Sequence, residues 1–177
     1  MTPSLRGPLR ISDPAMIDRI CRFRVEIWRR TGLVADWAFP DGTWRDALDD
    51  VAEHYAYFDG DALVCSTRVS MFATMDEMPD ADHYRALGLQ LRGPILMPER
   101  LVVAPEWRRT GLPAQIGDFC LRRARELGAN LILTEASPRT VPFLLRRGRR
   151  HLGPGPFDPR FPEVRFELIL TEAHAFR

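Results

Sequence analysis

The sequence predicts an α/β fold, and three observations support that fold class. Segments with the apolar spacing of amphipathic helices alternate with short apolar runs typical of strands. Two such runs, residues 54–58 and 62–72, flank the turn Asp59-Gly60 and form a predicted hairpin. A chain of 177 residues, 45% of them hydrophobic, can bury one sizeable core, so we expect a single domain over residues 1–177.

The other elements follow in chain order. Asp13 and Pro14 cap a predicted helix that carries apolar residues on one side and ends near Gly32. Residues 74–94 bear Pro and Gly and form a long excursion, and loops of that length are usually functional or mobile. The later predicted elements are a short helix over 84–87, a helix that begins near Arg109, a strand over 131–134, a helix over 138–147 and a last strand over 164–170.

Composition excludes several classes of enzyme. All 25 basic residues are arginine, so a Schiff-base lysine, a P-loop lysine and a kinase-type strand lysine are each impossible. The four histidines lack ligand spacing, and the three cysteines lie far apart, so no metal site or disulfide framework is predicted. No apolar stretch has the length of a secretory signal or a membrane span, and we expect a cytoplasmic protein without membrane contact.

Charge is unevenly distributed along the chain, although its net value is only +1. Acidic residues predominate between residues 36 and 85, and arginines predominate between residues 106 and 165. The chain has no recognised nucleic-acid-binding motif, so nucleic acid is not a predicted partner. The arginine-rich half is instead the half expected to meet anions, because guanidinium recognises phosphate bidentately.

Residues 100–128 join an apolar strand to an amphipathic helix through a short polar loop. The branched residues 101–103 suit a buried strand, and Pro105 ends it. If the helix begins near Arg109, its unpaired N–H groups and positive dipole end will attract an anion. Gly111 would let the backbone approach a bulky diphosphate. The segment therefore predicts a phosphate-binding loop.

This loop resembles the acyl-CoA binding motif R-x-x-G-x-(G/A) of the GNAT superfamily of N-acyltransferases, with Arg108, Gly111 and Pro113 on its marked positions. Pro113 departs from the usual Gly or Ala and offers no backbone N–H to the cofactor pyrophosphate. The resemblance implies a mixed, mostly antiparallel central sheet flanked by helices. It also implies a set of cofactor-binding residues: Leu101, Val102, Val103, Arg108, Arg109, Thr110, Gly111, Leu112, Pro113 and Ala114.

The N-terminal part of the chain is loosely similar to acyl-homoserine-lactone synthases and related N-acyl amino acid synthases. The residues that carry this likeness lie in segments 23–28, 46–49, 67–69 and 99–101. Those enzymes share the GNAT fold and often take acyl groups from an acyl carrier protein. They tend to lack the R-x-x-G signature that this chain keeps, so the preferred interpretation is an enzyme that depends on CoA.

Two glutamates are candidate catalytic bases for attack of an amine on a thioester. Glu99 lies two residues from Met97 and therefore on the same strand face, where several relatives place the base. An exposed strand-start carboxylate paired with an arginine is the alternative interpretation of Glu99. Glu135 is the second candidate, because ligands of open α/β sheets gather at strand ends. The tyrosine that protonates the leaving group in many relatives is replaced by Leu144.

The sequence thus predicts an N-acyltransferase that moves an acyl group from acyl-CoA to a small-molecule amine, with acetyl as the first candidate group. Two alternatives stay open. One is a longer-chain acyltransferase of the lactone-synthase type with an acyl carrier protein as partner, and the other is a non-catalytic module that binds acyl-CoA. A homodimer also stays open.

Overall fold

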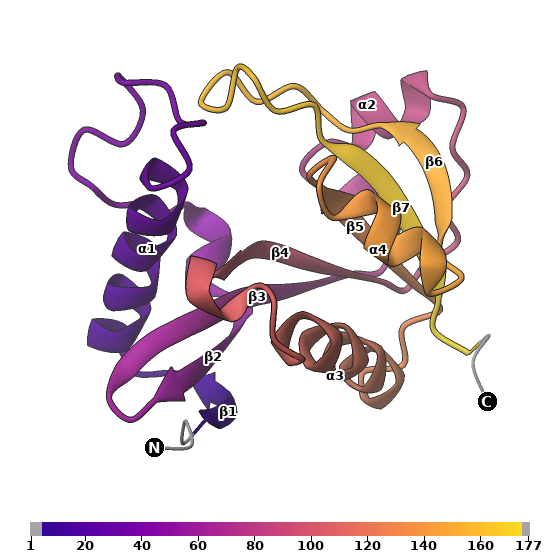
Figure 1. Cartoon of the computed structure of the whole chain (residues 1–177). Helices are drawn as coiled ribbons and strands as arrows, with labels where there is room; N and C mark the ends of the chain where they lie inside the picture. The colour runs from indigo at the N-terminus through magenta and orange to yellow at the C-terminus, as the bar shows by residue number, and fades with distance from the viewer. Residues whose placement is uncertain (1–4, 175–177) are drawn as a thin grey trace. The chain divides into compact units, whose positions relative to one another are not determined.

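The computed structural model describes residues 5–174 and assigns them to alternating strands and helices (Figure 1). The strands are β1 Leu5–Ile11, β2 Glu53–Asp59, β3 Ala62–Phe72, β4 Ile95–Val103, β5 Leu131–Ala136, β6 Arg150–Pro154 and β7 Glu167–Glu172. The α-helices are α1 Pro14–Arg29, α2 Ala81–Ala86, α3 Leu112–Glu126 and α4 Val141–Arg146. The short 3-10 helices are η1 Ala47–Asp50, η2 Met75–Glu77 and η3 Pro105–Trp107.

Hydrogen bonds link the strands into a sheet in the order β1-β2-β3-β4-β5-β7-β6. The pairs β1–β2, β2–β3, β5–β7 and β6–β7 are antiparallel, whereas β4 and β5 run parallel, with Ile95 opposite Leu131. The predicted fold class, a mixed and mostly antiparallel sheet flanked by helices, is therefore confirmed.

The described chain divides into two compact units. The first extends to Ser70 and also contains Glu99–Phe119. Within it, α1 begins at the predicted cap, where Asp13 accepts a hydrogen bond from the Met16 N–H, and lies beside the β2–β3 hairpin (Figure 1). Its buried face includes Ile20, Val25 and Ile27. Burial of that apolar stripe holds the helix, because isolated helices of this length are marginal in water.

The second unit contains Met71–Pro98 and the chain from Cys120 onward. In it, β7 lies between β5 and β6, and α4 packs against β7 through Leu144 and Ile169 (Figure 1). The predicted 84–87 helix is α2, which lies slightly earlier, and it buries Ala81 and Tyr84. No helix within residues 5–174 is long and apolar enough to cross a membrane.

The sequence did not predict β1, because Gly7-Pro8 is a typical turn pair and proline cannot donate to a strand ladder. The structure accommodates both residues at a register shift between Arg6 and Leu9, on the edge of the sheet where proline is tolerated. A Cβ atom on Gly7 would lie 2.7 Å from the Tyr57 ring, so only glycine fits there.

Gly93 provides a test of close backbone packing in the second unit. A Cβ atom at this position would lie 2.0 Å from the carbonyl oxygen of Ala73. We expect Gly93→Ala to lower the free energy of unfolding by about 2 kcal/mol or more, because backbone cannot move aside as a side chain can. Gly111→Ala is the matched control, since its Cβ would meet only Gln115 Nε2 at 3.8 Å. For the control, urea denaturation should show a change in the free energy of unfolding below about 1 kcal/mol. A similar change in the free energy of unfolding for the two variants would contradict the prediction.

Candidate functional site

The side chain of Glu99, on β4, is held by two donors from β3. Arg68 Nη2 donates to Oε1 over 2.9 Å, and Ser70 Oγ donates to Oε2 over 2.5 Å. Only 13% of the side chain is exposed. Glu99 is therefore paired with an arginine, as the alternative interpretation expected, but it is mostly buried rather than exposed.

Glu99 belongs to a buried ion network formed by Arg24, Asp46, Asp49, Arg68, Glu99 and Arg100. Arg68 Nη1 contacts Asp46 Oδ1 and also lies 3.2 Å from Asp49 Oδ2. Arg24 Nη1 donates to Asp49 Oδ1 over 2.8 Å, and both side chains are fully buried. The network contains three guanidinium groups and three carboxylates, so its formal charge is balanced.

Ion pairing outweighs burial at Asp46 and Arg68, whereas at Arg100 burial prevails and lowers the pKa of the guanidinium. Burial alone would raise the pKa of Asp46, but hydrogen bonds and charge from Arg68 and Arg100 lower it to about 2. Burial opposes ionisation of Arg68, yet the charge of Glu99 and the hydrogen bonds of its carboxylate partners raise the pKa of that guanidinium above its usual value. Burial lowers the pKa of the neighbouring His54, whose Nε2 lies 2.9 Å from the Asp49 carbonyl oxygen.

Arg100 interrupts the regular alternation of β4. Its φ of 51° lies in the left-handed region, which a non-glycine residue adopts at a cost of about 1–3 kcal/mol. The side chain offsets this cost with an ion pair to Asp46 at 2.9 Å and a cation–π contact to Trp44 at 4.2 Å. The next side chain, Leu101, is 41% exposed, whereas Val102 is buried.

The predicted helix start at Arg109 is wrong by three residues, because α3 begins at Leu112. Residues 108–110 form a turn after η3, in which the Thr110 hydroxyl donates to the Trp107 carbonyl over 2.7 Å. The same hydroxyl accepts the Leu112 N–H over 3.1 Å, and the Gly111 carbonyl accepts the first helical hydrogen bond, from the Gln115 N–H over 3.1 Å. The arginines at 108 and 109 therefore lie in the loop before the helix.

The predicted phosphate-binding loop, residues 108–111, is exposed and lies between β4 and α3. Arg108 Nε donates to the Val103 carbonyl over 2.9 Å and so ties the loop to the end of β4. Pro113 follows in the first helical turn, where its missing N–H removes no helical hydrogen bond. A Cβ at Gly111 would make only an ordinary contact with Gln115 Nε2 at 3.8 Å, so the fold does not require glycine there. Arginine charge and a helix N-terminus together suit an anion.

Glu135 lies in the second unit, at the C-terminal end of β5. Its Oε1 accepts a hydrogen bond from the Tyr84 hydroxyl over 3.0 Å, and Tyr84 is fully buried. The two predicted bases thus have separate partners: Glu99 belongs to the first unit with the phosphate-binding loop, and Glu135 to the second.

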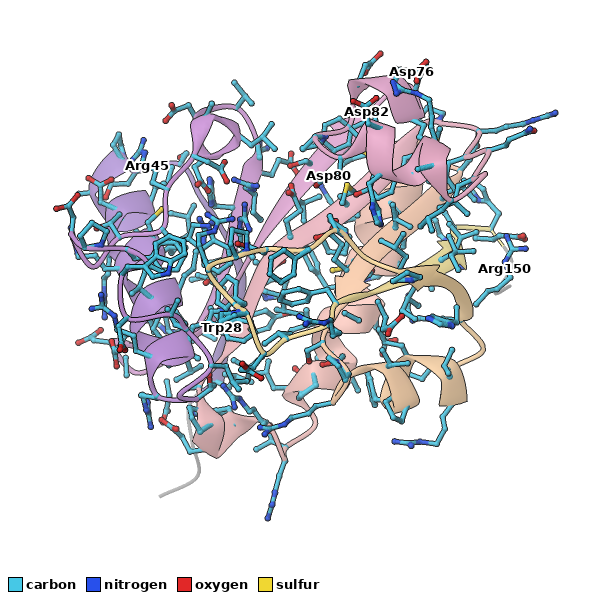
Figure 2. All side chains as sticks on the ribbon, turned by 90° about the horizontal axis from the view of Figure 1, so that it is seen from above. Trp28, Arg45, Asp76, Asp80, Asp82 and Arg150 are labelled. Atoms are coloured by element: carbon cyan, nitrogen blue, oxygen red, sulfur yellow. The ribbon has the colours of Figure 1, made fainter. Side chains whose placement is uncertain are left out.

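Acidic side chains also gather around η2 and α2, where Figure 2 shows Asp76, Asp80 and Asp82 together. Arg85 forms ion pairs with Asp76 and Asp82. Across residues 5–174, no group of three or more His, Cys, Asp or Glu side chains is arranged to hold a metal ion.

Sequence reasoning missed the buried ion network as a unit. Arg24, Asp46, Asp49 and Arg68 all occur in the segments that resemble lactone synthases, but no local pattern indicates how they pair. Arg24 and Asp49 are 25 residues apart, and Arg68 and Glu99 are 31 apart. A fully buried arginine is rare without paired carboxylates, so clustering could be inferred only once burial was known.

No protein-family model matches the sequence, and comparison with curated proteins finds no match. Several solved structures are similar. FeeM, an N-acyl amino acid synthase from uncultured soil microbes, has a TM-score of 0.69 at 13% identity, with 97% of this chain and 93% of that one covered. BjaI, a CoA-dependent acyl-homoserine lactone synthase, has a TM-score of 0.68 at 17% identity, with 91% and 77% covered.

A candidate acetyltransferase of the GNAT family from Desulfovibrio desulfuricans has a TM-score of 0.62 at 16% identity, with 96% of this chain and 98% of that one covered. At these identities the likeness establishes the fold. The order of strands and helices, the sheet topology and these neighbours agree that this chain has the GNAT fold.

Proposed function

We propose that the protein is an N-acyltransferase that moves an acyl group from acyl-CoA to a small-molecule amine. Acetyl is the first candidate for the transferred group. The observation that carries this proposal is the phosphate-binding loop. It joins β4 to α3, offers exposed arginines at 108 and 109, and has a glycine at 111 that the packing of the fold does not require. The similar solved structures support acyl transfer in general.

The proposed reaction needs little covalent help from the protein. The neutral amine attacks the thioester carbonyl, a C–N bond forms, the C–S bond breaks, and CoA leaves as a thiolate that takes up a proton. Glu99 is the proposed acceptor of the amine proton, with Glu135 as the second candidate. The hydrogen bonds from Arg68 and Ser70 fix the orientation of the Glu99 carboxylate.

The buried ion network favours a second candidate function, a longer-chain acyltransferase of the lactone-synthase type. Its six residues all belong to the segments by which the sequence resembles that branch of the superfamily. An acyl carrier protein as donor, and a homodimer, belong to this proposal as well.

The first test is CoA binding. CoA should raise the melting temperature by mass action, and Gly111→Asp should abolish that rise, because a carboxylate would occupy the place of the diphosphate. Thermal shift against CoA concentration measures the effect. Gly111→Ala controls for folding, and Gly60→Asp adds the same charge in the β2–β3 turn, where nothing lies within 4 Å of a Cβ and Asp is one of the few residues that adopt the left-handed φ of 57°. An unchanged shift in folded Gly111→Asp would remove the loop from the proposed site.

The second test is Glu99→Gln. If Glu99 is the base, kcat/KM should fall on the order of 10² to 10⁴-fold while CoA affinity stays nearly unchanged. The acidic limb of the pH–rate profile should change as well. Release of free CoA thiol with a panel of amines is the measurement.

Glu53→Gln is the matched control for this variant. Glu53 is also a strand carboxylate, 18% exposed, and its partners are Arg10 at 3.1 Å and the Tyr55 hydroxyl at 2.9 Å. Near-normal turnover of Glu99→Gln on the true amine would show that Glu99 is structural, and Glu135→Gln would be the next variant. CoA binding without turnover on any amine would favour the non-catalytic module.

The third test separates the two donors. We expect faster turnover of octanoyl-CoA than of the octanoyl acyl carrier protein, because the carrier's phosphopantetheine has one phosphate and lacks the diphosphate that the loop suits. Acetyl-CoA in the same assay reports chain-length preference. Faster turnover of the carrier protein would favour the lactone-synthase type.

A further inference from the structure

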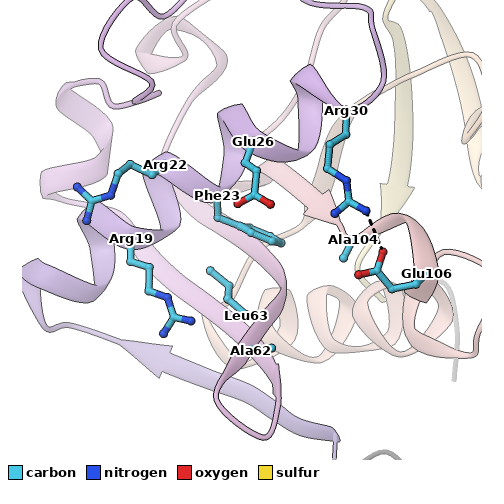
Figure 3. A pocket seen from close by; sticks show the side chains of 9 residues that line it. All are labelled: Arg19, Arg22, Phe23, Glu26, Arg30, Ala62, Leu63, Ala104 and Glu106. Carbon is cyan, nitrogen blue, oxygen red and sulfur yellow. Dashed lines mark hydrogen bonds and ion pairs between the residues drawn. The ribbon is translucent and has the colours of Figure 1, made fainter.

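A cavity of 480 Å³ lies in the first unit between α1, the start of β3 and the segment that follows β4 (Figure 3). Its volume is within the range of pockets for small ligands. It is lined by Arg19, Arg22, Phe23, Glu26, Arg30, Ala62, Leu63, Ala104 and Glu106. Neither candidate base lines it, so its ligand is not the amine that either base would deprotonate.

The floor of this cavity is apolar. The side chains of Phe23, Leu63 and Ala104 are buried, and Figure 3 shows the Phe23 ring in the middle of the lining residues. Such a floor contributes to binding only through the apolar surface that a ligand buries against it. A ligand of this cavity must therefore carry apolar groups of its own.

One end of the cavity carries positive charge. Arg19 and Arg22 are exposed and lie about one helical turn apart on α1. Arg19 Nη2 donates to the Asp61 carbonyl over 2.8 Å, and its guanidinium lies 6.0 Å from the centroid of the Phe58 ring. Within residues 5–174, no carboxylate pairs with Arg19 or Arg22. Like charges on one helix face repel each other, so a bound anion would relieve this repulsion.

A carboxylate lies over the middle of the floor. Glu26 is exposed, and Figure 3 shows its carboxylate above the Phe23 ring. Opposite charges four residues apart usually attract each other on a helix. The Glu26 side chain nevertheless forms no ion pair or hydrogen bond with another residue of the described chain, and Arg30 pairs instead with Glu106 at 3.5 Å. The carboxylate therefore stays available to an ammonium group of a ligand.

The spacing of these charges matches a short zwitterion. Arg22 and Glu26 are four residues apart, which is about 6 Å along the helix axis. A dipeptide spans about 7 Å, because an extended chain covers at most about 3.3–3.6 Å per residue. Its carboxylate and its ammonium group would therefore reach the two charges while its side chains lie on the floor.

We propose that this cavity binds a zwitterion with apolar side chains, for which a dipeptide is the better fit and a free amino acid is the second source. The carboxylate pairs with Arg22 beside Arg19, the ammonium group pairs with Glu26, and the side chains pack on Phe23 and Leu63. No residue of the predicted phosphate-binding loop lines the cavity. Binding of this ligand therefore needs neither CoA nor acyl transfer.

The two charges are tested with leucyl-leucine and two derivatives, one acetylated at the amino group and one amidated at the carboxylate. The wild-type protein should bind leucyl-leucine with a Kd of about 1 mM or tighter. Each derivative should bind on the order of 10-fold more weakly, because one charge-assisted hydrogen bond is lost. Isothermal titration calorimetry measures all three ligands.

Two variants should each remove one of these preferences. Glu26→Gln should reduce the preference over the acetylated derivative to near onefold and keep the preference over the amidated one. Arg22→Gln should reduce the preference over the amidated derivative and keep the preference over the acetylated one. A variant that weakens all three ligands equally would overturn the pairing assigned to that residue.

Asp18→Asn and Arg29→Gln are the matched controls. Both residues lie on α1 outside this cavity: Asp18 pairs with Arg45, and Arg29 donates to the Phe39 carbonyl over 2.9 Å. Both variants should keep the preferences of the wild-type protein. If they lose these preferences as Glu26→Gln and Arg22→Gln do, the overall charge of the helix selects the ligand and the cavity assignment fails.

The floor and the size of the ligand are tested with two further compounds. Glycyl-glycine has both charges and no side chains, and it should bind on the order of 10-fold or more weakly than leucyl-leucine, because it buries little apolar surface. Equal binding would overturn the role of the floor. Weaker binding of L-leucine than of leucyl-leucine would support the dipeptide, whereas equal or tighter binding would overturn it in favour of free amino acids.

The inference as a whole has a clear negative outcome. It is overturned if the folded wild-type protein shows no saturable binding of leucyl-leucine or L-leucine up to about 10 mM, or if leucyl-leucine and its two derivatives bind equally. These titrations contain no CoA. Their failure therefore leaves the proposed acyl transfer intact, and a failure of CoA binding leaves the zwitterion site intact.

Discussion

The fully buried guanidinium of Arg68 is the constraint on which the first unit depends. An arginine without water must have paired carboxylates, and removal of one partner from a buried pair typically costs about 3–5 kcal/mol. Arg68 meets this requirement with Asp46, Asp49 and Glu99, which come from the residue before η1, from η1 itself and from β4. The network thereby fixes the segment around η1 against β4. The same Asp46 also pairs with Arg100, whose backbone is strained.

The same network limits what Glu99 can do chemically. Its two carboxylate oxygens already accept from Arg68 and Ser70, so its orientation is fixed before any ligand binds. Preorganisation of this kind favours catalysis when the group faces its substrate. It equally suits a carboxylate whose purpose is to neutralise a buried arginine. The fixed orientation of the Glu99 carboxylate suits both roles, and a measurement of proton transfer distinguishes them.

The predicted phosphate-binding loop differs from the ion network in how little the fold constrains it. The fold makes few demands on it: residues 108–111 are exposed, and a Cβ at Gly111 would make only an ordinary contact with Gln115 Nε2. Glycine is among the residues favoured directly before a helix, and in the proposed function it also leaves room for a diphosphate.

The sequence by itself determined the order of helices and strands, the β2–β3 hairpin and the loop between β4 and α3, because periodicity and turn residues are local signals. It missed both edge strands: β1, which contains Gly7-Pro8, and β6, Arg150–Pro154, which contains Gly153-Pro154. It also placed the start of α3 three residues early, because the turn closed by the Thr110 hydroxyl was not recognised. Only the tertiary structure decided that Arg24, Asp49, Arg68 and Glu99 form one network. Such pairings join residues tens of positions apart, and burial in the folded chain, which no local pattern encodes, makes them necessary.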